Sequence, residues 1–184
     1  MPVPLIPYLH GLILPSEIII REATLEDMPG LLAIYNQVIA TSTSIYFDQP
    51  LPLENRIAFF HQRARENYPI FVAVDAQGIA GFASFGDFRP YPGYRFTVEH
   101  SIHMRPDQRG NGLGQKLMAL LFERARALNK HVILGVIDSD NAGSLRFHAR
   151  FGFEKVAFMP EVGFKFGRRL DLVIMQKILS ETPV

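Results

Sequence analysis

The segment Arg109-Gly110-Asn111-Gly112-Leu113-Gly114 constrains the fold most, because it joins a predicted strand over 96–104 to a predicted helix over 112–129. Glycine permits a tight turn and lets a ligand approach the backbone closely. The first turn of a helix adds unpaired N–H groups and the positive end of the helix dipole. The segment therefore predicts a metal-free site for a pyrophosphate group, to which Arg109 can add a charge-assisted hydrogen bond.

Other glycine-rich loops have a different spacing. A dinucleotide-binding fingerprint needs G-x-G-x-x-G after the first strand, with an acidic residue about 20 positions later, and a phosphate-binding Walker loop needs a lysine. This loop lies past the middle of the chain and follows the pattern Arg/Gln-x-x-Gly-x-Gly/Ala. A turn without a ligand is the structural alternative.

The rest of the chain alternates between strand and helix patterns. Strands are predicted over 17–21, 70–74, 79–85, 131–137, 153–159 and 170–178, and helices from Thr24, over 53–66 and over 141–151. A chain of 184 residues without repeats fits one core. We predict a single α/β domain over 17–180 with a mixed central sheet. Residues 1–16 form an N-terminal extension, which a start placed too early would also explain.

Composition narrows the chemistry. The 184 residues include no cysteine, which excludes disulfides, thiolate metal sites and a cysteine nucleophile. The formal net charge of +1 gives no support for nucleic acid or an anionic membrane as a partner. No apolar run approaches the roughly 18 residues that span a bilayer, and the scattered histidines predict no metal site. A reducing cytoplasm is the expected location.

Over about residues 18–178 the sequence resembles the GCN5-related N-acetyltransferase (GNAT) superfamily. The strand 97–104 with the loop 109–114 is similar to the acetyl-CoA signature of that family, and Asn141 followed by Phe151-Gly152-Phe153 is similar to its later motif. The resemblance implies a GNAT fold, in which a mixed sheet flanked by helices contains a splayed strand pair. It implies that acetyl-CoA is the cosubstrate. The implied contacts are Ser101, Ile102, His103, Met104, Arg109, Gly110, Asn111, Gly112, Leu113, Gly114, Asn141 and Ser144.

Two segments resemble a narrower group. Thr97-Val98-Glu99-His100-Ser101 and the segment 163–171 are similar to phosphinothricin and methionine sulfoximine N-acetyltransferases. This resemblance implies that the acceptor is the amino group of a small amino-acid analogue. It also implies a homodimer. The alternatives are an acetyltransferase for a peptide N-terminus, a polyamine or an antibiotic, and a module that binds acetyl-CoA without turnover.

Glu99 and His148 are the candidate catalytic residues. An amine with a pKa of about 9 is only about 1% deprotonated at pH 7, a handicap of about 2.7 kcal/mol that a general base can offset. Glu99 matches the base proposed in the resembled group. His148 lies seven residues after Asn141, where many relatives have a tyrosine, and is a candidate proton donor to the departing thiolate. Its alternative is a packing or hydrogen-bonding role.

Substrate contacts are predicted from charge and shape. Arg89 can hold the carboxylate of an amino acid, and Phe47 and Tyr91 can form walls of the acceptor pocket. Lys165 is a further candidate contact. We expect His100 and His103 to share no face of the strand with Glu99.

Overall fold

The computed structural model describes residues 18–179. The predicted extension over 1–16 lies outside the described residues, so the domain boundaries stay predictions. In chain order the elements are β1 (Ile19–Glu22), α1 (Met28–Thr41), α2 (Leu53–Arg65), β2 (Ile70–Asp75), β3 (Gly78–Asp87), β4 (Thr97–Met104), α3 (Leu113–Ala127), β5 (Val132–Asp138), α4 (Ala142–Arg150), β6 (Glu154–Lys165) and β7 (Arg168–Ile178), with single 3-10 turns at Leu25–Asp27, Pro92–Tyr94 and Pro106–Gln108.

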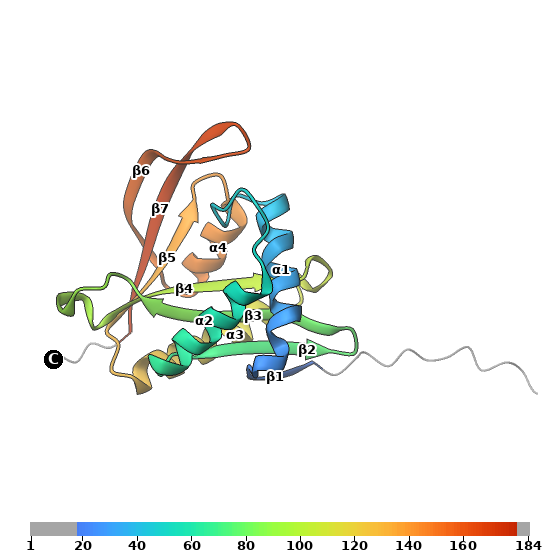
Figure 1. Ribbon diagram of the computed structural model, residues 1–184. Helices are drawn as coiled ribbons and strands as arrows, with labels where there is room; N and C mark the ends of the chain where they lie inside the picture. Colours follow the sequence, from blue (N-terminus) through green and yellow to red (C-terminus); the bar gives the residue numbers. More distant parts are fainter. Residues whose placement is uncertain (1–17, 180–184) are drawn as a thin grey trace, which may run out of the picture.

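The seven strands form one sheet in the order β1-β2-β3-β4-β5-β7-β6 (Figure 1). Only the β4–β5 pair is parallel, and the other neighbours run antiparallel. This arrangement confirms the predicted α/β fold with a mixed central sheet.

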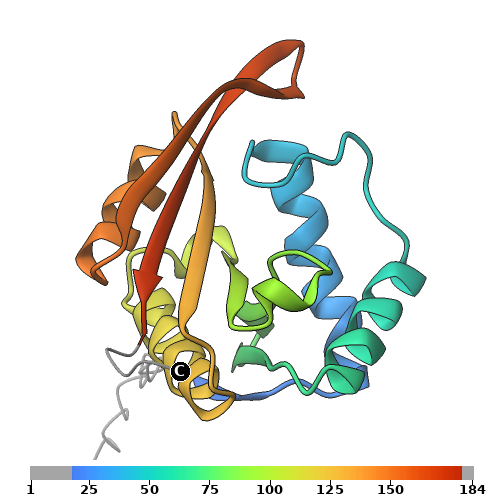
Figure 2. The ribbon, with the colours of Figure 1, turned by 90° about the vertical axis from the view of Figure 1, so that its left-hand side faces the viewer.

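Helices cover both faces of the sheet. Figure 2 shows α1 and α2 on one side and α3 and α4 on the other. On the α1 side, Met28 and Leu31 pack with Val72 and Phe82 in one core cluster. On the α3 side, a larger cluster joins Leu117 and its helical neighbours to the opposite faces of β3, β4 and β5. The side on which a strand residue lies therefore decides which helix pair it meets.

Local signals explain where several elements begin. The Thr24 N–H donates to the Asp27 carboxylate at 2.7 Å in a capping box. The helix predicted from Thr24 starts with a 3-10 turn, and the α-helix begins at Met28. The turn between β2 and β3 depends on Gly78, whose φ of +105° suits glycine. The Gln77 N–H donates to the Asp75 side chain at 2.8 Å in the same turn.

The closing hairpin is longer than predicted. The sequence suggested that the first strand ends at Met159, before Pro160, but β6 continues to Lys165. The pairing with β7 shifts register between Met159 and Gly163, so the segment containing the proline is an irregularity within an edge strand. Within residues 18–179, no helix is long and apolar enough to cross a membrane.

Candidate active site

A cavity of about 460 Å³ lies against β4 on the side of α1 and α2. Its walls come from α1, α2, β3, β4 and the segment that follows α1, and they include Tyr35, Phe47, Arg56, Arg63, Glu99 and His103. A smaller cavity of about 130 Å³ shares Glu99 and Tyr46 with the first and extends to Asp138 on β5. Glu99 is thus common to the walls of two cavities.

The position of Glu99 follows from the register of the sheet. It pairs with Gly86 of β3 on one side and with Leu134 of β5 on the other, and the latter is the last pair before β4 and β5 separate. Partial desolvation in the cavity wall raises the pKa of the Glu99 carboxyl, although the residue as a whole is exposed, and the charge of Arg89 opposes that rise. A carboxylate with a raised pKa that faces a cavity is suited to accept a proton.

The expectation that His103 shares no face with Glu99 is wrong. Side chains alternate along a strand, so positions 99, 101 and 103 all face the cavity, and His103 lies among its lining residues. The His103 ring meets Tyr35 edge-on with ring centroids 5.8 Å apart. Burial lowers the pKa of His103 to about 4. This histidine is therefore a neutral member of the cavity wall at pH 7.

His100 faces the other side of the sheet, where it meets His148 of α4. The two Nε2 atoms are 3.0 Å apart, and Nδ1 of His148 lies 2.7 Å from the Ser144 carbonyl oxygen. A carbonyl only accepts, so Nδ1 of His148 carries the proton and its Nε2 must accept from His100. Nδ1 of His100 is then an unprotonated, buried acceptor without a hydrogen-bond partner among the described residues.

This pairing bears on the predicted proton donor. Burial lowers the pKa of His148, and it lowers the pKa of His100 to about 3, so both rings are neutral at pH 7. The single N–H of His148 is used by Ser144. Proton donation by His148 stays a prediction, and it requires the ring to turn or to gain a second proton.

The parallel strands separate where the resemblance predicts it. Pairing between β4 and β5 is limited to Thr97, Val98 and Glu99 of β4, although both strands continue beyond this point. Residues 100–104 pair with β3 and leave their other edge without a strand partner. At Gly135 of β5, an added Cβ would lie 2.8 Å from the His148 ring. The histidine pair thus packs against the backbone at the start of the gap.

The loop 109–114 has the features of an anion site. Gly110 and Gly112 have φ of +83° and +78°, which glycine adopts without strain. Gly112 is the N-cap of α3 and no side chain caps this helix. In the described chain, no N–H of residues 110–114 donates a hydrogen bond, since the first donors of the helix are Gln115 and Lys116. Exposed Arg109 adds positive charge beside these donors.

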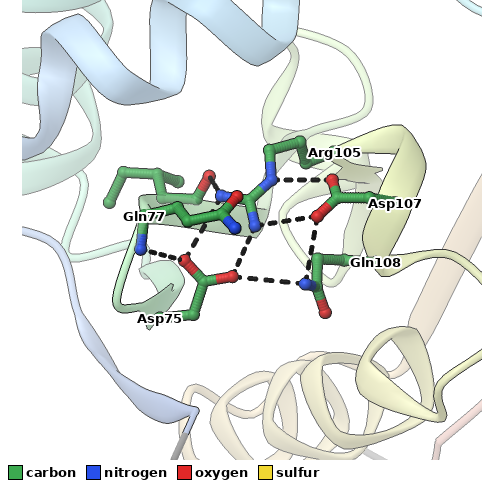
Figure 3. Close-up of polar contacts among 6 residues, drawn as sticks. Asp75, Gln77, Arg105, Asp107 and Gln108 are labelled. Carbon is green, nitrogen blue, oxygen red and sulfur yellow. Dashed lines mark hydrogen bonds and ion pairs between the residues drawn. The ribbon is translucent and has the colours of Figure 1, made fainter. Parts of the chain in front are cut away.

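A network of side chains fixes the segment before that loop (Figure 3). The guanidinium of Arg105 donates to Asp75 at 2.5 Å and to Asp107 at 2.7 Å, and Gln108 donates to Asp75 at 3.2 Å. The Arg105 bond holds the pKa of Asp75 below its usual range. Because Asp75 ends β2, this network ties the β2–β3 hairpin to the segment that enters the glycine-rich loop.

Asn141 and Ser144 have structural roles that the sequence only partly indicated. The Asn141 side chain is the N-cap of α4 and accepts from the Ser144 N–H at 3.0 Å. The Ser144 hydroxyl lies 3.3 Å from Nδ1 of His148. Contacts of both residues with a cofactor stay predictions.

The other predicted substrate residues lie in different settings. Phe47 lines the larger cavity. Arg89 is exposed beside Phe88, with its guanidinium carbon 4.8 Å from the ring centroid, and its charge acts on Glu99. Tyr91 is 66% exposed and lies outside the cavity walls. Neither residue lines the cavity, and of the two only Arg89 acts on Glu99 through its charge, so their contacts with substrate stay predictions.

The prediction that Lys165 contacts substrate is contradicted by its hydrogen bonds. Its ammonium group is buried and donates to the carbonyl oxygens of Ile39, Ser42 and Ile45 at 2.7, 2.8 and 2.5 Å. An ammonium has three N–H donors, and three carbonyls use them all. Lys165 instead holds the end of α1 and the segment that forms one wall of the cavity.

Sequence reasoning missed the two arginines of α2 that line the cavity. Arg56 is only 7% exposed, and Arg63 lies so close to Gly86 that an added Cβ there would be 2.4 Å from its Nη2. The signal was available, because both positions fall at helical spacing with Leu53 and Phe59 on the apolar side of α2. An arginine on that side must be buried or reach a cavity. Within residues 18–179, no three histidine or carboxylate side chains gather as metal ligands would.

Comparison with known proteins identifies a family and its members. The sequence model described as the acetyltransferase (GNAT) family matches residues 32–153. An L-methionine sulfoximine/L-methionine sulfone acetyltransferase of Pseudomonas aeruginosa is 52% identical over 164 residues, which cover 89% of this chain and 95% of that protein.

Two solved structures have the same fold. A phosphinothricin acetyltransferase of the GNAT superfamily from Sinorhizobium meliloti, in complex with acetyl-CoA, has a TM-score of 0.85 at 33% identity and covers 89% of each chain. A ribosomal-protein-alanine N-acetyltransferase from Brucella melitensis also has a TM-score of 0.85, at 41% identity, and covers 87% of this chain and 99% of that one.

Proposed function

We propose an acceptor for a chain that belongs to the acetyltransferase (GNAT) family and is an acetyl-CoA-dependent N-acetyltransferase. The proposed acceptor is the α-amino group of a small amino-acid analogue such as methionine sulfoximine, methionine sulfone or phosphinothricin. The observation that carries the proposal is the cavity at Glu99. It joins one base to two arginines in a space of about 460 Å³, which suits a small ligand.

Glu99 acts as the general base in this proposal. It accepts a proton from the acceptor ammonium, directly or through water. The free amine nitrogen then attacks the thioester carbonyl carbon and a C–N bond forms. The C–S bond breaks, the nitrogen loses a proton to leave the amide, and the sulfur departs with its electron pair and takes up a proton as the thiol. The raised pKa of Glu99 supports this role, because it brings the carboxylate closer in basicity to the amine that it must deprotonate.

Acetyl-CoA is proposed to bind at the gap between β4 and β5, on the opposite side from the Glu99 cavity. The free N–H groups of residues 110–114 would hold the pyrophosphate, with Arg109 beside them. The unpaired edge of residues 101–104 would pair with the amide groups of the pantetheine arm. Dependence on acetyl-CoA also supports a cytoplasmic location, where this thioester is made.

Arg89 is the proposed partner of the acceptor carboxylate. It is exposed, and its charge already acts on Glu99. Arg89→Ala should therefore raise KM for a free amino-acid analogue by about 10- to 100-fold. For the carboxamide of the same analogue, KM of Arg89→Ala should rise far less. Equal losses on both acceptors would mean that Arg89 supports the fold of the loop instead.

A panel of acceptors with detection of the released thiol tests the proposal. We expect turnover with methionine sulfone, methionine sulfoximine and phosphinothricin, and little with polyamines, aminoglycosides or peptides. A peptide N-terminus is the second candidate acceptor, favoured by the likeness to the Brucella melitensis enzyme. Good turnover of an N-terminal alanine peptide, with none of any free amino acid, would select that function.

A homodimer is also proposed, with β6 at the interface. This edge strand exposes apolar side chains, with Val156, Phe158, Val162 and Phe164 each at least half exposed. Such an apolar edge is typical of a surface that another chain covers. Sedimentation should give a dimer that Phe164→Asp converts to a monomer; a monomeric wild type would exclude it.

A further inference from the structure

Arg56 is a buried cation without an anionic partner. Only 7% of the residue is exposed, and its guanidinium carbon lies 4.0 Å from the centroid of Tyr35 and 4.8 Å from that of Phe59. Its Nε and Nη2 both donate to the neutral Asn55 side-chain oxygen, at 3.1 and 2.5 Å. Among residues 18–179, no carboxylate forms an ion pair with it.

The other charges of the cavity are already used. The charge of Arg63 is paired with Glu66, to which its Nη1 donates at 2.9 Å, although its buried Nε has no hydrogen-bond partner among the described residues, and Glu99 is assigned to the proton of the acceptor amine. His103 is neutral at pH 7 because burial lowers its pKa to about 4. Burying an unpaired charge is costly unless a partner compensates it. Arg56 is therefore the lining group whose charge remains for a ligand.

The guanidinium is held as a binding group would be. Tyr35 and Phe59 contact it through their rings, and a side-chain hydrogen bond with Tyr35 also acts on it, so that the plane of the guanidinium is fixed. Asn55 uses N–H groups of Nε and Nη2, and the remaining N–H groups of the planar guanidinium can donate to two oxygens on one atom. This geometry favours an acceptor whose side chain carries two oxygens on one atom, at a distance from its amino group.

We propose that Arg56 binds the oxygen-bearing end of the acceptor side chain and selects amino acids whose side chain carries a tetrahedral sulfur or phosphorus centre with exposed oxygens. This inference rests on the proposed function and adds a second contact to it. Arg89 takes the α-carboxylate, Glu99 takes the ammonium proton, and Arg56 takes the sulfone, sulfoximine or phosphinate oxygens. The assignment predicts that a thioether is a poorer acceptor than its sulfone, because it offers Arg56 no oxygen.

Matched acceptors test this division of roles. Methionine sulfone and methionine share the carboxylate and the amine and differ in the two oxygens on sulfur. In Arg56→Met, kcat/KM for the sulfone should fall by about 10- to 100-fold, while the value for methionine changes little. Arg56→Lys keeps the charge without the fork and should recover only part of the loss. Arg65→Met, at an exposed arginine of the same helix, is the control.

A binding measurement separates selection from folding. Methionine sulfone should raise the Tm of the wild type and of Arg65→Met, and should not raise that of Arg56→Met. The assignment would be overturned if Arg56→Met lost kcat/KM equally for the sulfone and for methionine, or if it kept the wild-type preference for the sulfone. In either case, turnover of the sulfone by the wild type would still support the proposed function. Absence of sulfone turnover in the wild type would instead remove the proposed function and this assignment with it.

Discussion

Replacing Glu99 by glutamine removes the proposed base while it keeps the shape of the side chain. An ammonium with a pKa of about 9 must lose its proton at pH 7, which costs about 2.7 kcal/mol from two pKa units of 1.36 kcal/mol each. General-base catalysis commonly contributes a factor of about 10² to 10⁴. We therefore expect kcat of Glu99→Gln at pH 7 to fall by about 10² or more, with KM for acetyl-CoA unchanged.

The pH profile gives the sharper form of this prediction. In the wild type, kcat/KM should rise as pH passes through the pKa of Glu99, which burial holds above its usual range. The variant has no such group, so its rate should follow the free amine and rise about tenfold per pH unit between about 7 and 9. The deficit of the variant should shrink over that interval.

Steady-state thiol release from pH 5 to 9 measures both profiles, with Glu123→Gln, at an exposed acid of α3, as the control. A wild-type rate for Glu99→Gln at pH 7, or a deficit that stays constant up to pH 9, would refute the reasoning.

Three further substitutions test the structural parts of the account. Gly112→Val should lower Tm through backbone strain and should also weaken acetyl-CoA binding in calorimetry. Gly167→Val is the control, because it has a similar positive φ of +74° in the β6–β7 turn and should lower only Tm. Lys165→Met leaves three carbonyls without their donor and should cost about 2–5 kcal/mol of folding free energy in chemical denaturation; an unchanged stability with a raised acceptor KM would restore the substrate role. Asp75→Asn removes a carboxylate whose pKa is depressed by Arg105, so the Tm gap to wild type should be largest at neutral pH and shrink as pH falls below about 4; a constant gap would argue against the ion pair.

Much of the fold and of the conformation of the glycine-rich loop 109–114 could be predicted from the sequence, because these features depend on local patterns. The glycines at 110 and 112 have the positive φ that only glycine adopts easily, and the strand before them and the helix after them follow ordinary periodicities. Asn141 lies at the helix start that its residue type favours. Such signals involve neighbours in the chain.

The surroundings of Lys165 and His148 depend on contacts between distant segments, which local patterns do not indicate. Lys165 lies 120 or more positions from the carbonyls that it binds, and nothing beside it in the sequence indicates them. The contact between His100 and His148 joins a strand to a helix 48 positions away. The His103 error was avoidable, because the alternation of side chains already places it on the face of Glu99.

A single competition experiment tests the central claim that the acceptor is a free amino-acid analogue. Purified enzyme is incubated with acetyl-CoA and equal concentrations of methionine sulfone and of a peptide with N-terminal alanine, and the acetylated products are identified by mass spectrometry. The account predicts that N-acetyl methionine sulfone forms first and in large excess, because Arg89 and Arg56 both have partners in that acceptor. Acetylated peptide as the main product, with methionine sulfone unmodified, would contradict it.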